Sequence, residues 1–540
     1  LNIRWPDDWR EQDHRLQRYK GFAAMAFARA NNIDRIIWDS PKPKFGIITS
    51  GKSYQDTRQA LYELGIDENV AKDIGLRLYK VGMPWPLEPE GVRAFCEGLD
   101  EVLVVEEKRE MIEHQLRWQL YNWKENVRPT VVGKHDENGE WQLPPENDLD
   151  VGIIAQVIAN RMAKLYKNAD MQAKLDYFSE RKRAYSGYTP AINRVPYFCS
   201  GCPHNSSTRV PEGSRATAGI GCHIMAINMD RNNETFTQMG GEGVPWVGQA
   251  PFTNEKHIFA NLGDGTYNHS GSLAIRQCVA AGVNITYKIL YNDAVAMTGG
   301  QRHEGGMTVP QIVDQVLAER VKKVAIATER MEDYALINLP KGVEVHDRTM
   351  IMKLQEEFRE IKGTTVIIYD QTCAAEKRRR RKRGKLADPA MRPFINEAVC
   401  EGCGDCSVQS NCVSVEPLET EFGRKRMINQ SSCNKDFSCV RGFCPSFVTV
   451  YGGEPRKSSK GTGPLEGLKL PALPNVTIPS FDETFHDYNI LVTGIGGTGV
   501  LTIGALLGMA AHLDGNACSI LDMAGLAQKG GAVLSHIRLA

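Results

Sequence analysis

The chain contains 540 residues, of which 42% are hydrophobic and 24% are charged, a composition typical of globular proteins. A chain of this length should form several domains, and we predict three or four. Lysine plus arginine and aspartate plus glutamate both total 65, so the charge balance gives no reason to expect nucleic acid or a membrane surface as a partner. No apolar run reaches the roughly 18 residues of a transmembrane helix.

The first residues do not resemble a signal peptide, so we expect a cytoplasmic protein. The sequence starts at Leu1 rather than at a methionine, and it stops at Ala540 within a strand-like run. We therefore expect it to be an internal piece of a longer protein.

Residues 1–130 alternate between short apolar runs and amphipathic stretches, which predicts an α/β domain with a parallel sheet. The strongest candidates are strands over 45–49 and 101–105 and helices over 53–64 and 109–123. Residues 131–194 are predicted to be a linker or helical connection, because their first part is polar and rich in turn-forming residues.

A second α/β domain is predicted over 195–390, where Gly263-Asp264-Gly265 closely follows an apolar run. The next strand-like run, 284–291, is followed by Asn292. If these strands are parallel neighbours, Asp264 and Asn292 project from the same carboxyl-terminal edge of the sheet, where α/β folds bind ligands. A carboxylate, an amide oxygen and a backbone carbonyl suit a Mg²⁺ ion that also binds phosphate oxygens.

The separation of 28 positions between Asp264 and Asn292 agrees with the Gly-Asp-Gly…Asn signature of thiamine-diphosphate enzymes. A Gly-Asp-Gly alone is a weak signal, because it also occurs in ordinary turns. Together with the spaced asparagine and the following Thr298-Gly299-Gly300-Gln301, it predicts a site for thiamine diphosphate and Mg²⁺.

The fourteen cysteines are clustered rather than spread evenly. Seven lie within residues 400–444, and two more form a Cys-x-x-Cys at Cys199 and Cys202. In a chain with no secretory signal, such clustering indicates metal ligation rather than disulfides. Three isolated cysteines are expected to be buried thiols, namely Cys96, Cys278 and Cys518.

The dense group has a spacing like that of bacterial two-cluster ferredoxins, in which the last cysteine of each motif ligates the cluster of the other motif. This rule predicts one complete [4Fe–4S] cluster on Cys400, Cys403, Cys406 and Cys444. It predicts a second cluster on Cys412, Cys433 and Cys439, with Asp436 where a fourth cysteine normally stands. Because a carboxylate is a harder and more labile iron ligand than a thiolate, this cluster is expected to be either Asp-ligated [4Fe–4S] or [3Fe–4S].

Residues 261–301 resemble the thiamine-diphosphate domain of the 2-oxoacid:ferredoxin oxidoreductase family, most closely its indolepyruvate branch in the fused, single-chain form. The resemblance implies that Mg²⁺ is bound by Asp264, Asn292 and the carbonyl of Ala294. It also implies that the cofactor lies beside Gly263, Gly265, Thr298, Gly299, Gly300 and Gln301.

In this family the thiamine domain carries a [4Fe–4S] cluster of its own. The resemblance implies that this proximal cluster is held by Cys199, Cys202, Cys222 and Cys373. Zinc is the alternative metal, since four thiolates suit it equally well. The glutamate that activates the cofactor is expected on a pyrimidine-binding domain outside this sequence, so no catalytic residue is assigned within it.

The resemblance extends to the other segments. Residues 1–130 resemble the family's transketolase-C-terminal-like domain, with the similarity carried by 80–87 and 104–109. We expect a ferredoxin-like two-cluster module over 391–455, a linker over 456–485, and the truncated start of a Rossmann-like gamma-type domain over 486–540. The Gly-x-Gly-x-x-Gly at 494–499 leaves an NAD site as an alternative there.

Thiamine chemistry and one-electron carriers in one chain indicate oxidative decarboxylation of a 2-oxoacid. The resemblance implies indolepyruvate or another arylpyruvate as the substrate, coenzyme A as the acyl acceptor and ferredoxin as the electron acceptor. It also implies a homodimer or higher oligomer that includes the missing pyrimidine-binding domain and the rest of the gamma domain. The alternatives are a pyruvate- or branched-chain-specific enzyme, a non-catalytic electron-transfer subunit, and a non-oxidative thiamine decarboxylase with a structural cluster.

Two features have more than one interpretation. The basic run 377–383 is either a solvated charged edge or a docking surface for an acidic electron carrier. Trp246 either lines the substrate pocket or is a buried core residue.

Overall fold

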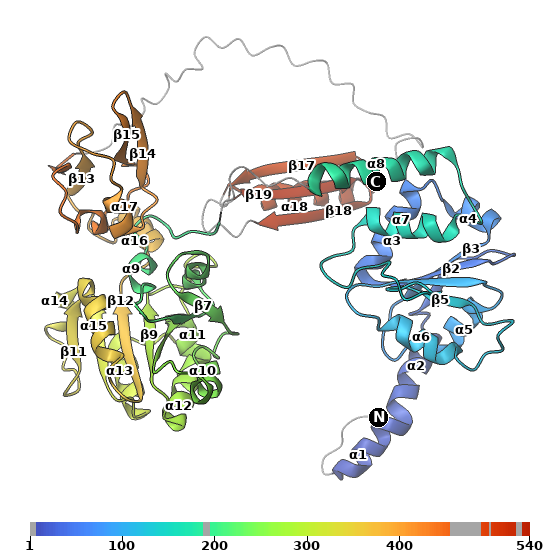
Figure 1. Cartoon of the computed structure of the whole chain (residues 1–540), viewed down its shortest axis with the longest axis horizontal. Helices are drawn as coiled ribbons and strands as arrows, with labels where there is room; N and C mark the ends of the chain where they lie inside the picture. The colour runs from blue at the N-terminus through green and yellow to red at the C-terminus, as the bar shows by residue number, and fades with distance from the viewer. Residues whose placement is uncertain (1–6, 187–194, 454–487, 496–497, 525–531, 540) are drawn as a thin grey trace. The chain divides into compact units, whose positions relative to one another are not determined.

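The computed structural model describes residues 7–186, 195–453, 488–495, 498–524 and 532–539. The chain divides into two compact units, Leu1–Ile192 and Asn193–Ala540 (Figure 1). Within the described segments, none of the helices combines the length and the apolar composition needed to cross a lipid bilayer.

The first unit is built on a five-stranded sheet with the strand order β1-β3-β2-β4-β5. β1 is antiparallel to β3, and the other neighbouring strands are parallel. The strands are β1 (Arg35–Trp38), β2 (Phe45–Ser50), β3 (Leu76–Val81), β4 (Glu101–Val105) and β5 (Thr130–Val132). The helices are α1 (Trp9–Arg15), η1 (Leu16–Lys20), α2 (Gly21–Ala30), α3 (Gly51–Glu63), α4 (Glu68–Ile74), α5 (Pro89–Cys96), α6 (Ile112–Leu120), α7 (Val151–Met162) and α8 (Ala169–Ser186).

Both faces of this sheet are buried, which explains why its strands read as nearly continuous apolar runs. Successive side chains of a strand point to opposite faces. Ile47 accordingly packs in a core cluster with α3 and α7, whereas Ile48 packs in a second cluster with α5 and α6 (Figure 1). The strands and helices predicted for this unit are confirmed as β2, β4, α3 and α6.

The segment predicted as a linker or helical connection, 131–194, contributes to the same folded unit as far as it is described. β5 pairs in parallel with β4, although the predicted domain boundary falls inside it. Ile154 of α7 and Leu175 of α8 are buried in the same cluster as Ile47 of β2. The polar composition of 130–150 conceals the contribution of β5, because the few buried apolar residues of this stretch are widely spaced.

The second unit contains a seven-stranded sheet with the order β11-β10-β12-β9-β8-β6-β7, and every neighbouring pair is parallel. The strands are β6 (Ala216–Ala218), β7 (Asn233–Phe236), β8 (Ile258–Gly263), β9 (Ile285–Tyr291), β10 (Val324–Thr328), β11 (Glu344–Asp347) and β12 (Thr364–Asp370). The longer helices around it are α12 (Ser272–Ala281), α13 (Val309–Ala318), α15 (Ile351–Phe358) and α16 (Ala374–Lys382). The shorter ones are α9 (His204–Ser207), η2 (Cys222–Asn228), α10 (Pro245–Gln249), η3 (Ala250–Phe252), α11 (Asp264–Thr266), η4 (Tyr267–Gly271), α14 (Met331–Tyr334) and η5 (Arg348–Met350).

Helices cover both faces of this sheet as well. One core cluster joins alternate residues of β8 and β9, such as Leu262 and Ile289, to α12 and α13. A second cluster, on the opposite face, joins Tyr369 of β12 to α15. The prediction that the strand before Asp264 and the strand before Asn292 are parallel neighbours is confirmed, since Gly263 of β8 is in register with Leu290 of β9.

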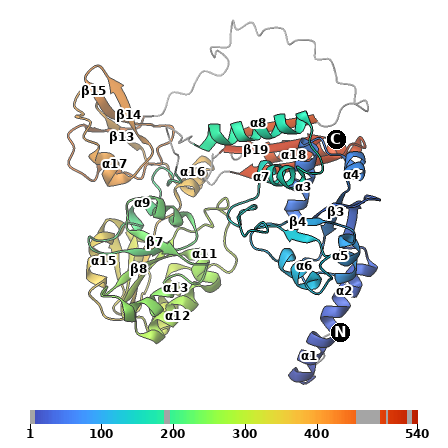
Figure 2. The same ribbon diagram turned by 45° about the vertical axis from the view of Figure 1, so that its right-hand side comes forward.

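A small cysteine-rich module, residues 391–453, follows α16. Its strands β13 (Met391–Ile395) and β16 (Phe447–Tyr451) form one antiparallel pair, and β14 (Val415–Thr420) and β15 (Gly423–Ile428) form another. Two short helices complete it, α17 (Asp405–Ser410) and η6 (Ser438–Val440). The module is seen next to α16 and α9 in both views (Figures 1 and 2).

The C-terminal segment has three strands, β17 (Tyr488–Ile495), β18 (Cys518–Ala524) and β19 (Ala532–Leu539), and one helix, α18 (Val500–Leu513). β19 lies between the other two strands and is antiparallel to both. The expected strand–turn–helix is present as β17 and α18, but the central strand is reversed relative to the parallel order of a Rossmann unit. The predicted linker 456–485, two glycines of the 494–499 turn and residues 525–531 lie outside the described residues.

Candidate active site

The carboxyl-terminal edge of the seven-stranded sheet holds Asp264 directly after β8 and Asn292 directly after β9. Oδ2 of Asp264 accepts hydrogen bonds from the backbone N–H groups of Asn292 and Asp293, each at 3.0 Å. Oδ1 of Asp264 accepts a third bond from the N–H of Gly265 at 2.9 Å, and Oδ1 of Asn292 accepts one from the N–H of Ala294 at 3.2 Å. The edge therefore presents a carboxylate and an amide oxygen from neighbouring strands.

Asp264 is almost completely buried, with 4% of its surface exposed. Burial raises the pKa of this carboxyl, and the three N–H donors act in the opposite direction. A buried carboxylate with free lone pairs favours a metal ion at this position. His223 lies next to this edge, since its Cε1 is 3.2 Å from the position that a Cβ on Gly263 would occupy. Its Nε2 is buried without a hydrogen-bond partner. The donor set thus fits Mg²⁺ and a polar ligand.

The segment after Asn292 returns to the same edge. Val295 and Gln301 form an isolated antiparallel bridge, closed by a Val295 N–H to Gln301 carbonyl bond of 2.8 Å. Gly299 and Gly300 have φ values of 127° and 83°, so the turn between them needs glycine. Thr298 Oγ1 donates to Gln301 Oε1 at 2.8 Å. The predicted cofactor residues 298–301 are thus a tight turn whose polar side chains bond to each other, and their contact with the cofactor stays a prediction.

Four cysteines predicted as proximal ligands line a single cavity, although they come from three separate segments: Cys199, Cys202, Cys222 and Cys373. Burial raises the pKa of the Cys202 thiol well above its usual value, and the neighbouring Cys222, Cys199 and Cys373 thiols raise it further. A cavity of four convergent thiols fits an iron–sulfur cluster, in which each thiolate binds a different iron atom. The described residues contain no group of three His, Cys, Asp or Glu side chains close enough to share one metal ion.

The cavity lined by the four cysteines, called the cysteine cavity below, lies next to the sheet edge that carries Asp264 and Asn292, called the thiamine edge below. The two have Asn292 in common. The backbone N–H of Cys373 donates to the carbonyl of Asn292 at 3.2 Å, and the N–H of Gln371 donates to the carbonyl of Tyr291 at 3.0 Å. These bonds continue the parallel β9–β12 pairing beyond the ends of the strands. The two predicted sites are consequently neighbours along one sheet edge.

Five of the seven cysteines of the module belong to its small core or pack against it. Cys400 and Cys406 are buried there, and Cys412, Cys433 and Cys439 pack against the same cluster. Burial raises the pKa of Cys439 to about 12, and the adjacent Cys412 and Cys433 thiols add to the effect. Cys403 is exposed and Cys444 is half-buried. The structure thus gathers Cys412, Cys433 and Cys439 as predicted, while their role as iron ligands stays a prediction.

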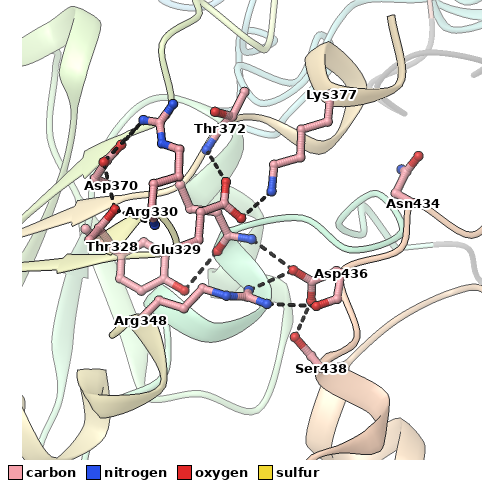
Figure 3. Close-up of polar contacts among 12 residues, drawn as sticks. Thr328, Glu329, Arg330, Arg348, Asp370, Thr372, Lys377, Asn434, Asp436 and Ser438 are labelled. Atoms are coloured by element: carbon pink, nitrogen blue, oxygen red, sulfur yellow. Dashed lines mark hydrogen bonds and ion pairs between the residues drawn. The ribbon is translucent and has the colours of Figure 1, made fainter. Parts of the chain in front are cut away.

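Asp436 has other partners in the structure than the sequence spacing suggests. Its Oδ1 accepts hydrogen bonds from Arg348 at 2.7 Å and from Nε2 of Gln371 at 2.9 Å (Figure 3). Its Oδ2 accepts a bond from the Ser438 hydroxyl. Sequence reasoning missed Arg348 and Gln371, which belong to the thiamine domain, because no local motif marks a residue whose partner is 88 or 65 positions away.

Trp246 is a core residue and does not line the candidate site. Its side chain is buried in the cluster shared with α12 and α13. Its indole N–H donates to the carbonyl of Asn284 at 3.0 Å, just before the first residue of β9. Asn292 stands at the other end of that strand, so Trp246 and the thiamine edge occupy opposite ends of the sheet.

Comparison with known proteins identifies three family models along the chain. Residues 34–182 match the indolepyruvate ferredoxin oxidoreductase middle domain. Residues 219–368 match the C-terminal TPP binding domain of thiamine pyrophosphate enzymes. Residues 489–540 match the pyruvate ferredoxin/flavodoxin oxidoreductase family. These matches fall on the first sheet, the thiamine edge and the C-terminal strands, respectively.

The indolepyruvate oxidoreductase subunit IorA of Thermococcus kodakarensis is 24% identical over 392 residues, which cover 69% of this chain and 55% of that protein. Subunit IorB of the same organism is 40% identical over 52 residues, or 10% of this chain and 26% of IorB. A solved 2-oxoglutarate:ferredoxin oxidoreductase from Magnetococcus marinus shares 20% identity and covers 34% of this chain and 67% of its own, with a TM-score of 0.26. The chain spans about half the length of the IorA relatives that it matches.

The parallel sheet, its Asp264–Asn292 edge and the match to a TPP binding domain define a thiamine-diphosphate-binding domain. The matches on either side of this domain are to the middle domain of indolepyruvate ferredoxin oxidoreductase and to the pyruvate ferredoxin/flavodoxin oxidoreductase family. Over separate segments, the chain is similar to indolepyruvate and pyruvate ferredoxin oxidoreductases.

Proposed function

We propose that this chain takes part in the oxidative decarboxylation of a 2-oxoacid of the arylpyruvate class, with indolepyruvate as the first candidate. The acyl group would pass to coenzyme A and the electrons, one at a time, to ferredoxin. The observation that carries the proposal is the shared edge, where Asn292 belongs both to the thiamine edge and to the cavity of four cysteines. A thiamine site beside a one-electron acceptor favours oxidation over simple decarboxylation.

Thiamine diphosphate, when bound, supplies a carbon nucleophile for the keto group and an electron sink for the pair released as CO₂ leaves. The residues that would hold it are Asp264, Asn292 and the Ala294 carbonyl, through Mg²⁺. The four cavity thiols would hold the cluster that accepts the first electron. For each 2-oxoacid and coenzyme A consumed, two oxidised ferredoxins become reduced, and CO₂, one proton and the acyl-coenzyme A are released.

The arylpyruvate specificity is supported by the indolepyruvate oxidoreductase relatives and the matching middle domain. The chain matches both an IorA and an IorB subunit. We therefore infer that functions carried by two subunits in those relatives are joined here in one chain. The activity also requires a pyrimidine-binding domain, which supplies the glutamate that activates the cofactor.

An anaerobic dye-reduction assay on the intact protein tests the proposal. The substrates to compare are indolepyruvate, phenylpyruvate, pyruvate and 2-oxoisovalerate, each with and without coenzyme A. We expect the arylpyruvates to reduce a viologen dye fastest and to require coenzyme A. Faster reduction with pyruvate or 2-oxoisovalerate would reassign the substrate, and release of aldehyde without dye reduction would refute the oxidative reaction.

A further inference from the structure

Two cysteine-bearing loops, far apart in the sequence, are in direct contact. The loop between Cys199 and Cys202 meets the loop that begins at Cys433. Asn434 Nδ2 donates to the Ser200 carbonyl at 2.8 Å, and the hydroxyl groups of Ser200 and Ser414 lie 2.6 Å apart. Ser414 follows Cys412 by two positions. These contacts therefore join the loop of the proximal ligands Cys199 and Cys202 to the segments that carry Cys412 and Cys433, predicted ligands of a second cluster.

Gly201 shows how close this approach is. Its φ is +64°, and a Cβ added there would stand 2.7 Å from Cβ of Asp436. Real Cβ atoms do not approach each other this closely, so only glycine permits this contact. The glycine of the Cys-x-Gly-Cys sequence is thus explained by the module that packs against it.

The carboxylate of Asp436 is directed toward the thiamine domain in this contact (Figure 3). Arg348 donates from one nitrogen to Oδ1 of Asp436 at 2.7 Å and from another to its carbonyl oxygen at 2.8 Å, and Gln371 adds its Nε2 donor at 2.9 Å. The Arg348 and Asp436 side chains are 13% and 11% exposed, respectively. Gln371 stands two residues before Cys373 and therefore connects this bond to the proximal cysteines.

Charge balance favours keeping Asp436 in this position. Arg348 is a buried guanidinium whose ion pair in the described part of the chain is with Asp436. Arg441 and Lys377 also face this region, Lys377 being paired with Glu329 (Figure 3). If the carboxylate turned to bind iron, Arg348 would remain as a buried cation without its partner, which is strongly unfavourable.

The basic run 377–383 completes the same interface. α16 begins directly after Cys373, and successive arginines reach in two directions. Arg379 donates to the Gly299 carbonyl at 2.9 Å and Arg380 pairs with Asp293 at 2.6 Å, both on the thiamine edge. Arg378 and Arg381 donate to the carbonyls of Ser431 and Asn434, on either side of Cys433. At least these four arginines hold parts of the chain together, so the run is more than a solvated charged edge.

We propose that Asp436 is a positioning residue that docks the cysteine module onto the thiamine domain through Arg348 and Gln371, and that it is not a ligand of iron. The order of electron transfer, which rests on the proposed function, follows from the docking. A cluster held by the proximal cysteines would pass electrons to a cluster on Cys412, Cys433 and Cys439, whose loops touch the Cys199–Cys202 loop. A cluster on Cys400, Cys403, Cys406 and Cys444 would be the last carrier, since Cys403 is exposed.

Three variants of the intact, anaerobically purified protein separate docking from ligation: Asp436→Asn, Arg348→Met and the charge swap Arg348→Asp with Asp436→Arg. Glu419→Gln is the matched control, because Glu419 forms an exposed ion pair with Arg424 in the same module. The readouts are iron and acid-labile sulfide per chain, the EPR spectrum after dithionite reduction, and amide hydrogen exchange over 197–202 and 433–438.

If Asp436 docks the module, Asp436→Asn and Arg348→Met behave alike. Both variants keep the iron content of the unmodified protein and lose the magnetic coupling between the proximal cluster and its neighbour. Hydrogen exchange of the backbone amides over 197–202 and 433–438 becomes about 10- to 100-fold faster, as expected for the loss of a charged hydrogen bond. The charge swap restores slow exchange and coupling, and Glu419→Gln changes nothing.

The proposal is overturned if Asp436→Asn loses iron or changes the spectrum of its own cluster while Arg348→Met does not, or if the charge swap loses iron without restoring the contact. Reduction by a 2-oxoacid is measured separately. If no 2-oxoacid reduces any cluster of the unmodified protein, the proposed function fails, yet iron content and hydrogen exchange still decide whether Asp436 docks the module.

Discussion

Replacing Asp264 with asparagine tests the thiamine edge at its most constrained residue. Oδ2 of Asp264 accepts two N–H bonds and Oδ1 accepts a third. Asparagine has one oxygen, which can serve the Asn292 and Asp293 donors, while its NH₂ group faces the N–H of Gly265. Losing that charge-assisted bond costs about 1.5–3 kcal/mol, part of which is offset because the buried charge disappears. We therefore expect the cofactor-free variant to fold.

The effect on cofactor binding is expected to be larger. At a cofactor concentration of 100 times Kd, binding stabilises the native protein by about 2.7 kcal/mol. For a domain of this size, that corresponds to roughly 5–11 °C in Tm. Removing an anionic metal ligand, at about 3 kcal/mol, raises Kd roughly 150-fold. At the same cofactor concentration the stabilisation then falls to about 0.3 kcal/mol, roughly 1 °C.

The assay is thermal unfolding of the anaerobic protein with and without thiamine diphosphate and Mg²⁺. Asp370→Asn is the matched control, because Asp370 is also buried and ends the neighbouring strand β12, where it binds Arg330, Thr328 and Tyr334. This control should lower Tm but keep the cofactor-induced shift. A full shift in Asp264→Asn, or its equal loss in both variants, would refute the assignment of the thiamine edge.

Three further predictions concern the same unit. Lys288 is buried and donates to the Ser207 and Arg209 carbonyls, and burial lowers its pKa from 10.5 to about 7. The unfolded chain therefore binds more protons between about pH 7 and 10.5, so the free energy of unfolding should rise through this window, by on the order of 5 kcal/mol. Lys288→Met should abolish this rise in pH-dependent denaturation curves. Trp246→Phe should lower the free energy of unfolding by about 1–3 kcal/mol in denaturant titrations, because the Asn284 carbonyl loses its donor. The relative rates with different 2-oxoacids should not change. A changed ranking of substrates would contradict the core role of Trp246. Cys373→Ala should lower the iron content by about four out of about twelve atoms per chain, whereas Cys278→Ala, at a buried cysteine away from both cysteine groups, should leave it unchanged.

The sequence was sufficient to predict features whose parts are linked by local spacing. A strand followed by Gly-Asp-Gly, and a second strand followed by Asn292, could be placed on one edge because adjacent parallel strands end at the same side of a sheet. The family resemblance implied that Cys199, Cys202, Cys222 and Cys373 form one group, and the structure gathers these four cysteines around one cavity.

Features that depend on long-range packing were not predictable. The spacing of Asp436 suggests an iron ligand, and its contact with Arg348 is invisible in the sequence because it forms only after two domains meet. The basic run 377–383 suggested solvent or an external partner, but at least four of its arginines bind carbonyls or carboxylates of the same unit. Likewise, residues 131–194 were predicted only as a linker or helical connection, and the sequence alone does not show that α7 covers a face of the first sheet.

The most direct test of the account is whether electrons from a 2-oxoacid reach the cysteine cavity beside Asn292. We predict that anaerobic mixing of the intact, cofactor-loaded protein with indolepyruvate and coenzyme A produces the EPR signal of a reduced iron–sulfur cluster within one turnover. The signal should be absent in Asp264→Asn, although dithionite still reduces its clusters. Release of CO₂ and aldehyde while every cluster stays oxidised would contradict the account.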